Sequence, residues 1–263
     1  MSKFIDKLAN LNKAMIPPLG FGRSNNEEKP EPMLLMVELA GKSADEIRDL
    51  MAAGVAAGLV DISGLTAGVL SKLSSAGLPV GLLLSNGKPA GMKVANGGID
   101  FIVYGPELPL RAFEGWTLEQ TGKVLSLDLA ADAGLMRSVN NLYPGVDAVL
   151  VDLTASPFMV GHMMSCRRAA DFSGQPIIAR TGNSLSVVEL TALREAGVKC
   201  LLLSAATHAE EVKALSETIK ALPKPARKKG PKDVPLVPII GVVPEKEEDG
   251  GDGDGDGDGD DGD

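Results

Sequence analysis

The chain has few aromatic residues and few cysteines. Aromatics make up 3% of its 263 residues, whereas hydrophobic residues make up 44%. We therefore expect an aliphatic core built from Leu, Val, Ile, Ala and Met. The two cysteines, Cys166 and Cys200, each lie inside an apolar stretch and belong to no CxxC motif or Cys/His cluster with metal-ligand spacing. This pattern predicts two buried thiols in a reducing compartment and argues against a disulfide framework.

Long hydrophobic runs are also absent. The longest are under ten residues, whereas a membrane-spanning helix needs about 20. The first residues, MSKFIDKLANLNKAMIPPLG, lack the continuous apolar region of a secretory signal. These two absences predict a cytoplasmic protein with no membrane partner.

The negative charge is concentrated at the C-terminal end. The formal net charge is −9, but residues 245–263 hold eleven acids and one lysine, a net charge of −10, so the other 244 residues sum to +1. The alternation of Gly and Asp has nothing to bury, which predicts a disordered acidic tail that solubilises the chain or binds cations weakly. This tail lacks the terminal Glu and the flanking helices of an EF-hand.

Four parts are expected along the chain. They are an N-terminal extension (1–32) whose first helix would lie under the main domain, the main domain itself (33–222), a basic and Pro-rich linker (223–244) and the tail (245–263). The linker contains KPARKKGPK, with five basic residues and no acid. Such a stretch can contact nucleic acid or anionic lipid. The acidic block beside this basic stretch makes self-association of the chain an equal alternative to such contacts. We therefore do not expect nucleic acid as a partner.

Residues 33–222 alternate between short apolar runs and helix-like segments. The runs are apolar on both faces, which predicts buried parallel strands joined by right-handed crossovers. The intervening segments 86–98 and 107–116 are weak as helices. The eight predicted strands are 33–39, 58–63, 80–85, 100–105, 123–129, 147–153, 176–181 and 199–204.

Helix start and stop signals separate these strands. Three capping boxes and one N-cap followed by proline predict helix starts, and a recurring Ala-Gly joint predicts helix ends. The starts are Ser43–Glu46, Ser186–Glu189, Thr207–Glu210 and Ser156-Pro157, and the closing glycines are Gly54, Gly77, Gly174 and Gly197.

Eight consecutive strand–helix units are typical of a (β/α)8 barrel. An open doubly wound sheet would instead carry a glycine fingerprint after the first strand, but ELAGKSADEI follows there. Its GKS lacks the glycine that a P-loop needs five positions before Gly41. Residues 33–222 thus resemble the aldolase-like TIM barrels, a superfamily that includes flavin- and phosphate-binding members. The resemblance implies an α/β fold, a compact (β/α)8 TIM barrel, and singles out no one family.

Every predicted strand has a polar residue at or near its end. The eight are Glu38, Asp61, Ser85, Tyr104, Asp128, Asp152, Arg180 and Ser204. TIM-barrel sites lie at this end of the strands, and converging carboxylates need a cation, a proton or an arginine among them. We expect Glu38, Asp128 and Asp152 to be acid/base residues, and Asp61 with Asp128 to bind a divalent metal. The alternative is a structural network with Arg180, or helix capping.

The segment after the seventh strand is a candidate anion site. ARTGNSLS places Gly182, Asn183 and Ser184 just before a helix start, where backbone N–H groups attract anions, and Arg180 would add a bidentate contact. Ser204 ends the neighbouring eighth strand as a further ligand-binding residue. The segment SAATHAEE after it lacks the glycine that the flavin- and phosphate-binding relatives usually place there. The alternative is that this segment after the seventh strand forms only a turn followed by a helix cap and binds no anion.

Schiff-base chemistry is disfavoured, because Lys123 and Lys199 stand at strand beginnings, the wrong end of a barrel. His208, near the mouth, is a candidate base. The leading hypothesis is therefore a barrel that binds a small anionic or phosphorylated ligand, with a divalent metal as an optional cofactor. If it is an enzyme, lyase or isomerase chemistry is expected. A non-catalytic scaffold acting through its C-terminal segments, and less favourably a flavin-binding oxidoreductase, are the alternatives, and homo-oligomerisation stays open.

Overall fold

The computed structural model describes residues 2–14, 32–64, 77–84, 98–114, 116–154 and 157–223. By its internal contacts the chain divides into two units, Met1–Pro225 and Ala226–Asp263. All described residues belong to the first unit. The predictions made for the acidic tail and for most of the linker concern residues outside this part and stay predictions.

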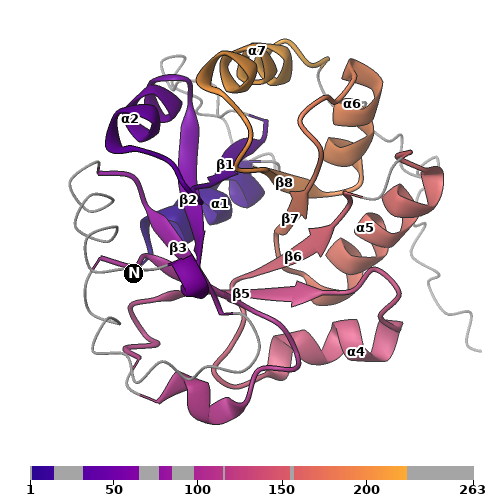
Figure 1. The fold of residues 1–263 in the computed structure, drawn as a ribbon. Helices are drawn as coiled ribbons and strands as arrows, with labels where there is room; N and C mark the ends of the chain where they lie inside the picture. Colours follow the sequence, from indigo (N-terminus) through magenta and orange to yellow (C-terminus); the bar gives the residue numbers. More distant parts are fainter. Residues whose placement is uncertain are drawn as a thin grey trace, which may run out of the picture. The chain divides into compact units, whose positions relative to one another are not determined.

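Eight parallel strands close into a barrel in which each strand pairs with its neighbours in sequence and β1 pairs with β8 (Figure 1). The predicted TIM barrel is confirmed. The second strand begins earlier than predicted, because Val55 and Ala57 already pair with β1. The strands are β1 (Leu34–Glu38), β2 (Val55–Asp61), β3 (Val80–Leu84), β4 (Phe101–Tyr104), β5 (Gly122–Leu127), β6 (Ala148–Asp152), β7 (Ile177–Arg180) and β8 (Val198–Leu203).

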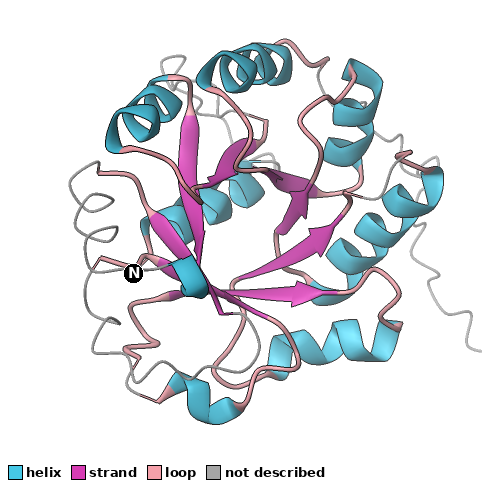
Figure 2. Cartoon of the chain, in the orientation of Figure 1, coloured by secondary structure: helices cyan, strands magenta, loops and turns pink. Residues whose placement is uncertain are grey.

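Helices surround the strands (Figure 1, Figure 2). The weak segment 107–116 forms only one turn of 3-10 helix, η2, while most of the other weak segment, 86–98, lies outside the described residues. The helices among the described residues are α1 (Lys3–Ala14), α2 (Ala44–Ala52), η1 (Ile62–Gly64), η2 (Leu110–Phe113), α4 (Ala133–Ser138), η3 (Val139–Asn141), α5 (Val160–Ser173), α6 (Val187–Glu195) and α7 (Ala209–Lys220).

Helix starts follow the sequence signals with two exceptions. The capping boxes of α2 and α6 are present as predicted, at Ser43 and Ser186. The predicted box at Thr207 is wrong, because its hydroxyl donates to a neighbouring loop and α7 is capped one residue later. The predicted start of α5 at Ser156-Pro157 is also wrong, since the N-cap of α5 is Met159.

The Ala-Gly joints turn helices into strands as predicted. Gly54, between α2 and β2, has φ 106°, and Gly197, between α6 and β8, has φ 101°. Residues other than glycine rarely adopt a backbone conformation in this left-handed region, so glycine suits both joints.

Alternation along the strands divides the apolar residues into two cores. On β1, Leu34 and Met36 belong to the cluster inside the barrel, whereas Leu35 and Val37 belong to the cluster between the strands and the outer helices. This is the period of two that a strand imposes on its side chains. Leu34 and Met36 of β1 therefore face the barrel interior.

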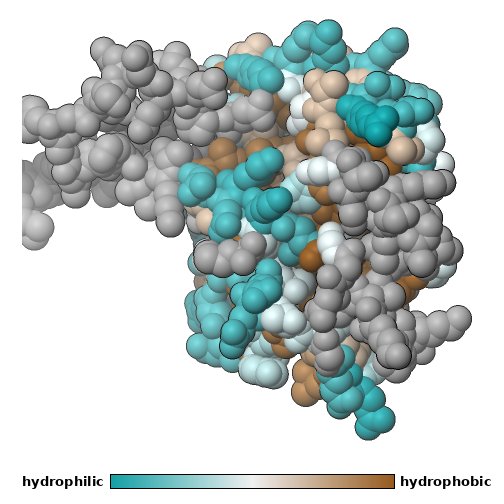
Figure 3. All heavy atoms as spheres, turned by 90° about the vertical axis from the view of Figure 1, so that its left-hand side faces the viewer, coloured by the Kyte–Doolittle hydropathy of each residue, from teal (hydrophilic) through white to brown (hydrophobic). Residues whose placement is uncertain are grey.

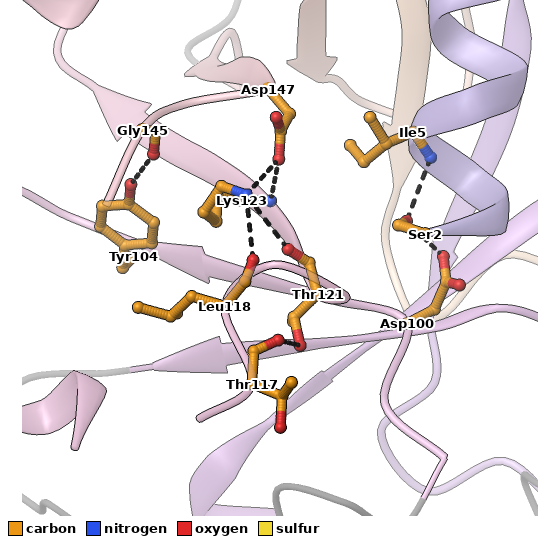
Figure 4. A network of polar contacts seen from close by, with 10 residues as sticks. All are labelled: Ser2, Ile5, Asp100, Tyr104, Thr117, Leu118, Thr121, Lys123, Gly145 and Asp147. Carbon is orange, nitrogen blue, oxygen red and sulfur yellow. Dashed lines mark hydrogen bonds and ion pairs between the residues drawn. The ribbon is translucent and has the colours of Figure 1, made fainter. Parts of the chain in front are cut away.

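α1 closes the amino-terminal end of the barrel, under the main domain as predicted. Phe4 is fully buried and its ring centroid lies 4.7 Å from that of Phe101 on β4. Asp100, just before β4, caps α1 by accepting hydrogen bonds from the N–H groups of Lys3 (2.8 Å) and Phe4 (2.9 Å) and from the Ser2 hydroxyl (2.7 Å; Figure 4). We call this closed end the floor.

Lys123 belongs to a second polar group at the floor (Figure 4). Its ammonium group lies 3.1 Å from the Asp147 carboxylate, and it donates to the carbonyl oxygens of Leu118 (3.2 Å) and Thr121 (3.4 Å). Lys123 thus lies at the amino-terminal ends of β5 and β6, as expected of a residue that takes no part in chemistry at the mouth.

The surface of the described part is mixed in character. On the face seen in Figure 3, hydrophobic residues form separate patches among hydrophilic ones. Among the described residues, no helix has the length and apolar character needed to cross a bilayer.

Candidate functional site

Three polar residues from different strand ends line one cavity at the carboxyl-terminal end of the barrel, which we call the mouth. Glu38, Asp61 and Arg180 surround a space of about 310 Å³, whose other lining residues are Ala40, Leu59 and Leu83. Each of the three continues the inward-facing parity of its strand. The polar mouth therefore begins where the apolar interior ends.

Arg180 joins two carboxylates across the mouth. One of its Nη atoms lies 2.6 Å from Glu38 Oε1, and the other lies 3.6 Å from Asp152 Oδ2. The side chains of Arg180 and Glu38 are each 29% exposed, whereas that of Asp152 is 56% exposed. The closer, less exposed pair with Glu38 is the stronger contact, because solvent screens it less. Part of the arrangement thus matches the structural-network alternative.

Three aspartate side chains accept hydrogen bonds from the backbone of the loops that follow them. Asp61, Asp128 and Asp152 each accept a hydrogen bond from the N–H group two residues ahead, that of Ser63, Ala130 and Thr154 respectively. Burial raises the pKa of Asp152, but hydrogen bonds from Thr154 and the charge of Arg180 outweigh it, so the net pKa lies below its usual value.

Asp128 does not line the mouth cavity. Its side chain is exposed, and the loop that follows it is held from outside the barrel by Arg168, which donates to the carbonyl oxygens of Leu129 (2.9 Å) and Ala131 (2.8 Å). Within the described ranges, no three His, Cys, Asp or Glu residues are grouped so that they could hold a metal ion. The geometry of the described residues therefore does not support the prediction that Asp61 and Asp128 bind a metal ion.

The loops after β7 and β8 are tied together by Asn183. Its Oδ1 accepts hydrogen bonds from the hydroxyls of Ser204 (3.2 Å) and Thr207 (2.9 Å). Gly182 and Ser184, on either side of Asn183, are exposed. In the part of the chain that the structure describes, the N–H groups of residues 182–184 have no protein acceptor. The predicted ligand-binding residues Gly182, Asn183, Ser184 and Ser204 therefore lie together.

Two buried polar atoms beside these loops lack hydrogen-bond partners among the described residues. They are the Thr181 hydroxyl and Nε of Arg180. On the other side, Lys42 donates from Nζ to the Thr207 carbonyl (2.8 Å), which links the loop after β1 to the loop after β8. Sequence reasoning missed Thr181, Thr207 and Lys42. Thr207 was assigned to a cap, and Lys42 was considered only as part of a P-loop.

Tyr104 does not join the mouth as the sequence suggested. Tyr104 points away from the barrel interior and packs edge-on against Phe113 at 5.0 Å, because β4 places Phe101 and Val103 inward. Ser85 lies outside the described residues. His208 is exposed at the start of α7 and does not line the mouth cavity.

Comparison with known proteins identifies the fold. No family model and no curated protein sequence matches the chain. A protein from Aquifex aeolicus VF5 superposes with a TM-score of 0.59 at 10% identity, over 83% of this chain and 97% of that one. A mutant tryptophan synthase α-subunit from Pyrococcus furiosus gives 0.55 at 12% identity, over 73% and 98%.

Thiamine phosphate pyrophosphorylase from Pyrococcus furiosus is similar to the same extent, with a TM-score of 0.53 at 12% identity over 73% of this chain and 98% of that one. At such low identity these likenesses establish the architecture alone. Together with the closed eight-stranded parallel barrel, they show that the chain has a (β/α)8 TIM-barrel fold.

Proposed function

We propose that the protein binds a small phosphorylated or otherwise anionic ligand at the mouth of its barrel. The observation that carries the proposal is the pairing of the loops after β7 and β8 through Asn183, together with N–H groups of residues 182–184 that have no acceptor among the described residues. Successive free backbone N–H groups form anion-binding concavities, and many TIM barrels bind phosphate with these two loops.

The remainder of the ligand would occupy the mouth cavity. Its volume of about 310 Å³ equals roughly ten water molecules at about 30 Å³ each, which suits a small metabolite. Glu38 and Asp61 line it and would accept protons or hydrogen bonds from the ligand. Arg180 would orient Glu38 and Asp152 and add positive charge beside the anion. One similar structure, thiamine phosphate pyrophosphorylase, is named for a phosphate ester, which is compatible with this proposal.

The test is binding of inorganic phosphate and glycerol phosphate, measured by isothermal titration calorimetry and by the shift in thermal midpoint. Gly182→Pro removes one of the three N–H groups, whereas Gly182→Ala keeps it and has open space for its methyl group. We expect the proline variant to bind about tenfold more weakly and the alanine variant to bind as the wild type does.

A second matched pair guards against misfolding of the proline variant. Asn183→Ala should release the two loops and weaken binding. Asn140→Ala, an exposed asparagine that hydrogen-bonds Gln175 on the outside of the barrel, should not change it. If millimolar phosphate and glycerol phosphate leave the wild-type thermal midpoint unchanged, the proposal is wrong.

A further inference from the structure

The helix ring is thin on the side of β4 and β5. There the connection after β4 forms only η2, one turn of 3-10 helix. Between η2 and the α4–η3 segment lies a cavity of about 190 Å³ whose walls include Phe113 and Tyr104. This cavity lies outside the barrel and is separate from the mouth cavity, whose lining residues it does not share.

The rim of this outer cavity is apolar and exposed. Leu110 is 72% exposed, Leu135 47%, Leu142 42% and Tyr143 82%, and all four line the same cavity. None of its described lining residues carries a charge. A contiguous, uncharged and exposed apolar rim of this kind marks an interaction surface.

The same surface offers both a projecting ring and a hollow of matching size. Tyr143 projects into solvent beside the outer cavity that it helps to line. A cavity of about 150 Å³ is large enough to take a benzene ring, so one of about 190 Å³ fits a phenol ring. A surface that contains both parts is self-complementary, which is the condition for a two-fold symmetric interface.

We propose that the protein forms a symmetric dimer in which Tyr143 of each copy enters the outer cavity of the other. The described lining residues carry no charge, which allows two identical surfaces to meet without like-charge repulsion. Buried aromatic side chains contribute strongly to such interfaces. The loops of the proposed ligand site follow β7 and β8, on other strands of the barrel, so the dimer leaves that site open. This inference does not depend on the proposed function.

Sedimentation velocity of the full chain, from about 1 to about 100 µM, tests the dimer. The wild type should shift from monomer to dimer across this range. Tyr143→Asp removes the projecting ring, and Ser138→Trp fills the hollow from an exposed lining position. Each should raise the dimer dissociation constant by about thirtyfold or more. Val188→Asp, at an equally exposed position (77%) on α6, should leave it unchanged.

The circular dichroism spectrum should be the same in both variants and in the wild type, which separates a lost interface from a lost fold. A wild type that stays monomeric over the whole range overturns the proposal. So does a dimer that both variants retain. A monomer in which Tyr143 is nevertheless protected from chemical modification also overturns it, since the apolar segment 233–243 of the chain would then be the occupant.

Discussion

The two ends of the barrel are built on opposite principles. The floor is closed by α1, whose Phe4 is fully buried against Phe101 and whose Lys3 and Phe4 N–H groups donate to Asp100. The mouth is open, and its polar residues are only partly covered. At the mouth the Arg180 and Glu38 side chains keep 29% of their surface exposed, and the N–H groups of residues 182–184 have no acceptor among the described residues.

This difference separates stability from function within one barrel. Apolar burial and a satisfied helix cap stabilise the floor, because both remove surface and unpaired donors from water. Partly satisfied polar groups at the mouth contribute little to stability but keep hydrogen-bonding capacity for a ligand. Substitutions at the floor should therefore reduce the free energy of unfolding, and substitutions at the mouth should mainly affect binding.

The largest effect is expected from Phe4→Ala. It leaves a cavity under the barrel and removes the contact with Phe101, so we expect a loss of about 3–5 kcal/mol in the free energy of unfolding. Urea denaturation followed by circular dichroism measures it. Lys7→Ala, at an exposed position of the same helix, should change the free energy by less than about 0.5 kcal/mol. Equal losses in the two variants would show that α1 does not seal the floor.

A glycine pair compares the two ends directly. A methyl group added at Gly81 would overlap the Phe101 ring, whereas at Gly182 nothing lies within 4 Å of it. Gly81→Ala should therefore cost about 1–3 kcal/mol through overpacking, and Gly182→Ala should be nearly neutral. Thermal unfolding of both variants measures the difference. Similar midpoints would mean that the interior near the floor has free space after all.

The smallest effect is expected at Asp152 and depends on pH. Its folded-state pKa is lowered, so its contribution to stability is present above the unfolded-state pKa of about 3.9 and is lost as pH falls through the folded-state value. The free-energy difference between wild type and Asp152→Asn should shrink from pH 7 to pH 3. Because this side chain is 56% exposed, the change should be a fraction of a kcal/mol. A difference that stays constant with pH contradicts the lowered pKa of Asp152 and the contacts with Thr154 and Arg180 that cause it.

Much of the fold follows from local patterns. Ser43 and Ser186 start helices because their side chains satisfy helix N–H groups a few residues away, and such contacts are visible in sequence. The same local pattern gave a wrong prediction of a helix cap at Thr207. Its local pattern is that of a cap, but its hydroxyl bonds Asn183, 24 residues away, and no local signal distinguishes the two partners.

The candidate site was only partly predictable. Gly182, Asn183, Ser184 and Ser204 could be grouped, because adjacent strands of a barrel bring their following loops together. Tyr104 could not be placed, since the position at which β4 starts decides whether its last residue faces inward or outward. A shift of one residue in the register of a strand moves each of its side chains to the opposite face.

The sequence by itself determined the eight strands and the glycine joints, because these depend on apolar periodicity and on backbone conformations that only glycine readily adopts. Tertiary structure decided which polar strand ends meet. Glu38 and Arg180 are 142 positions apart, and they pair because β8 closes the barrel between β1 and β7. Closure and register are properties of the whole barrel, and therefore no single segment encodes them.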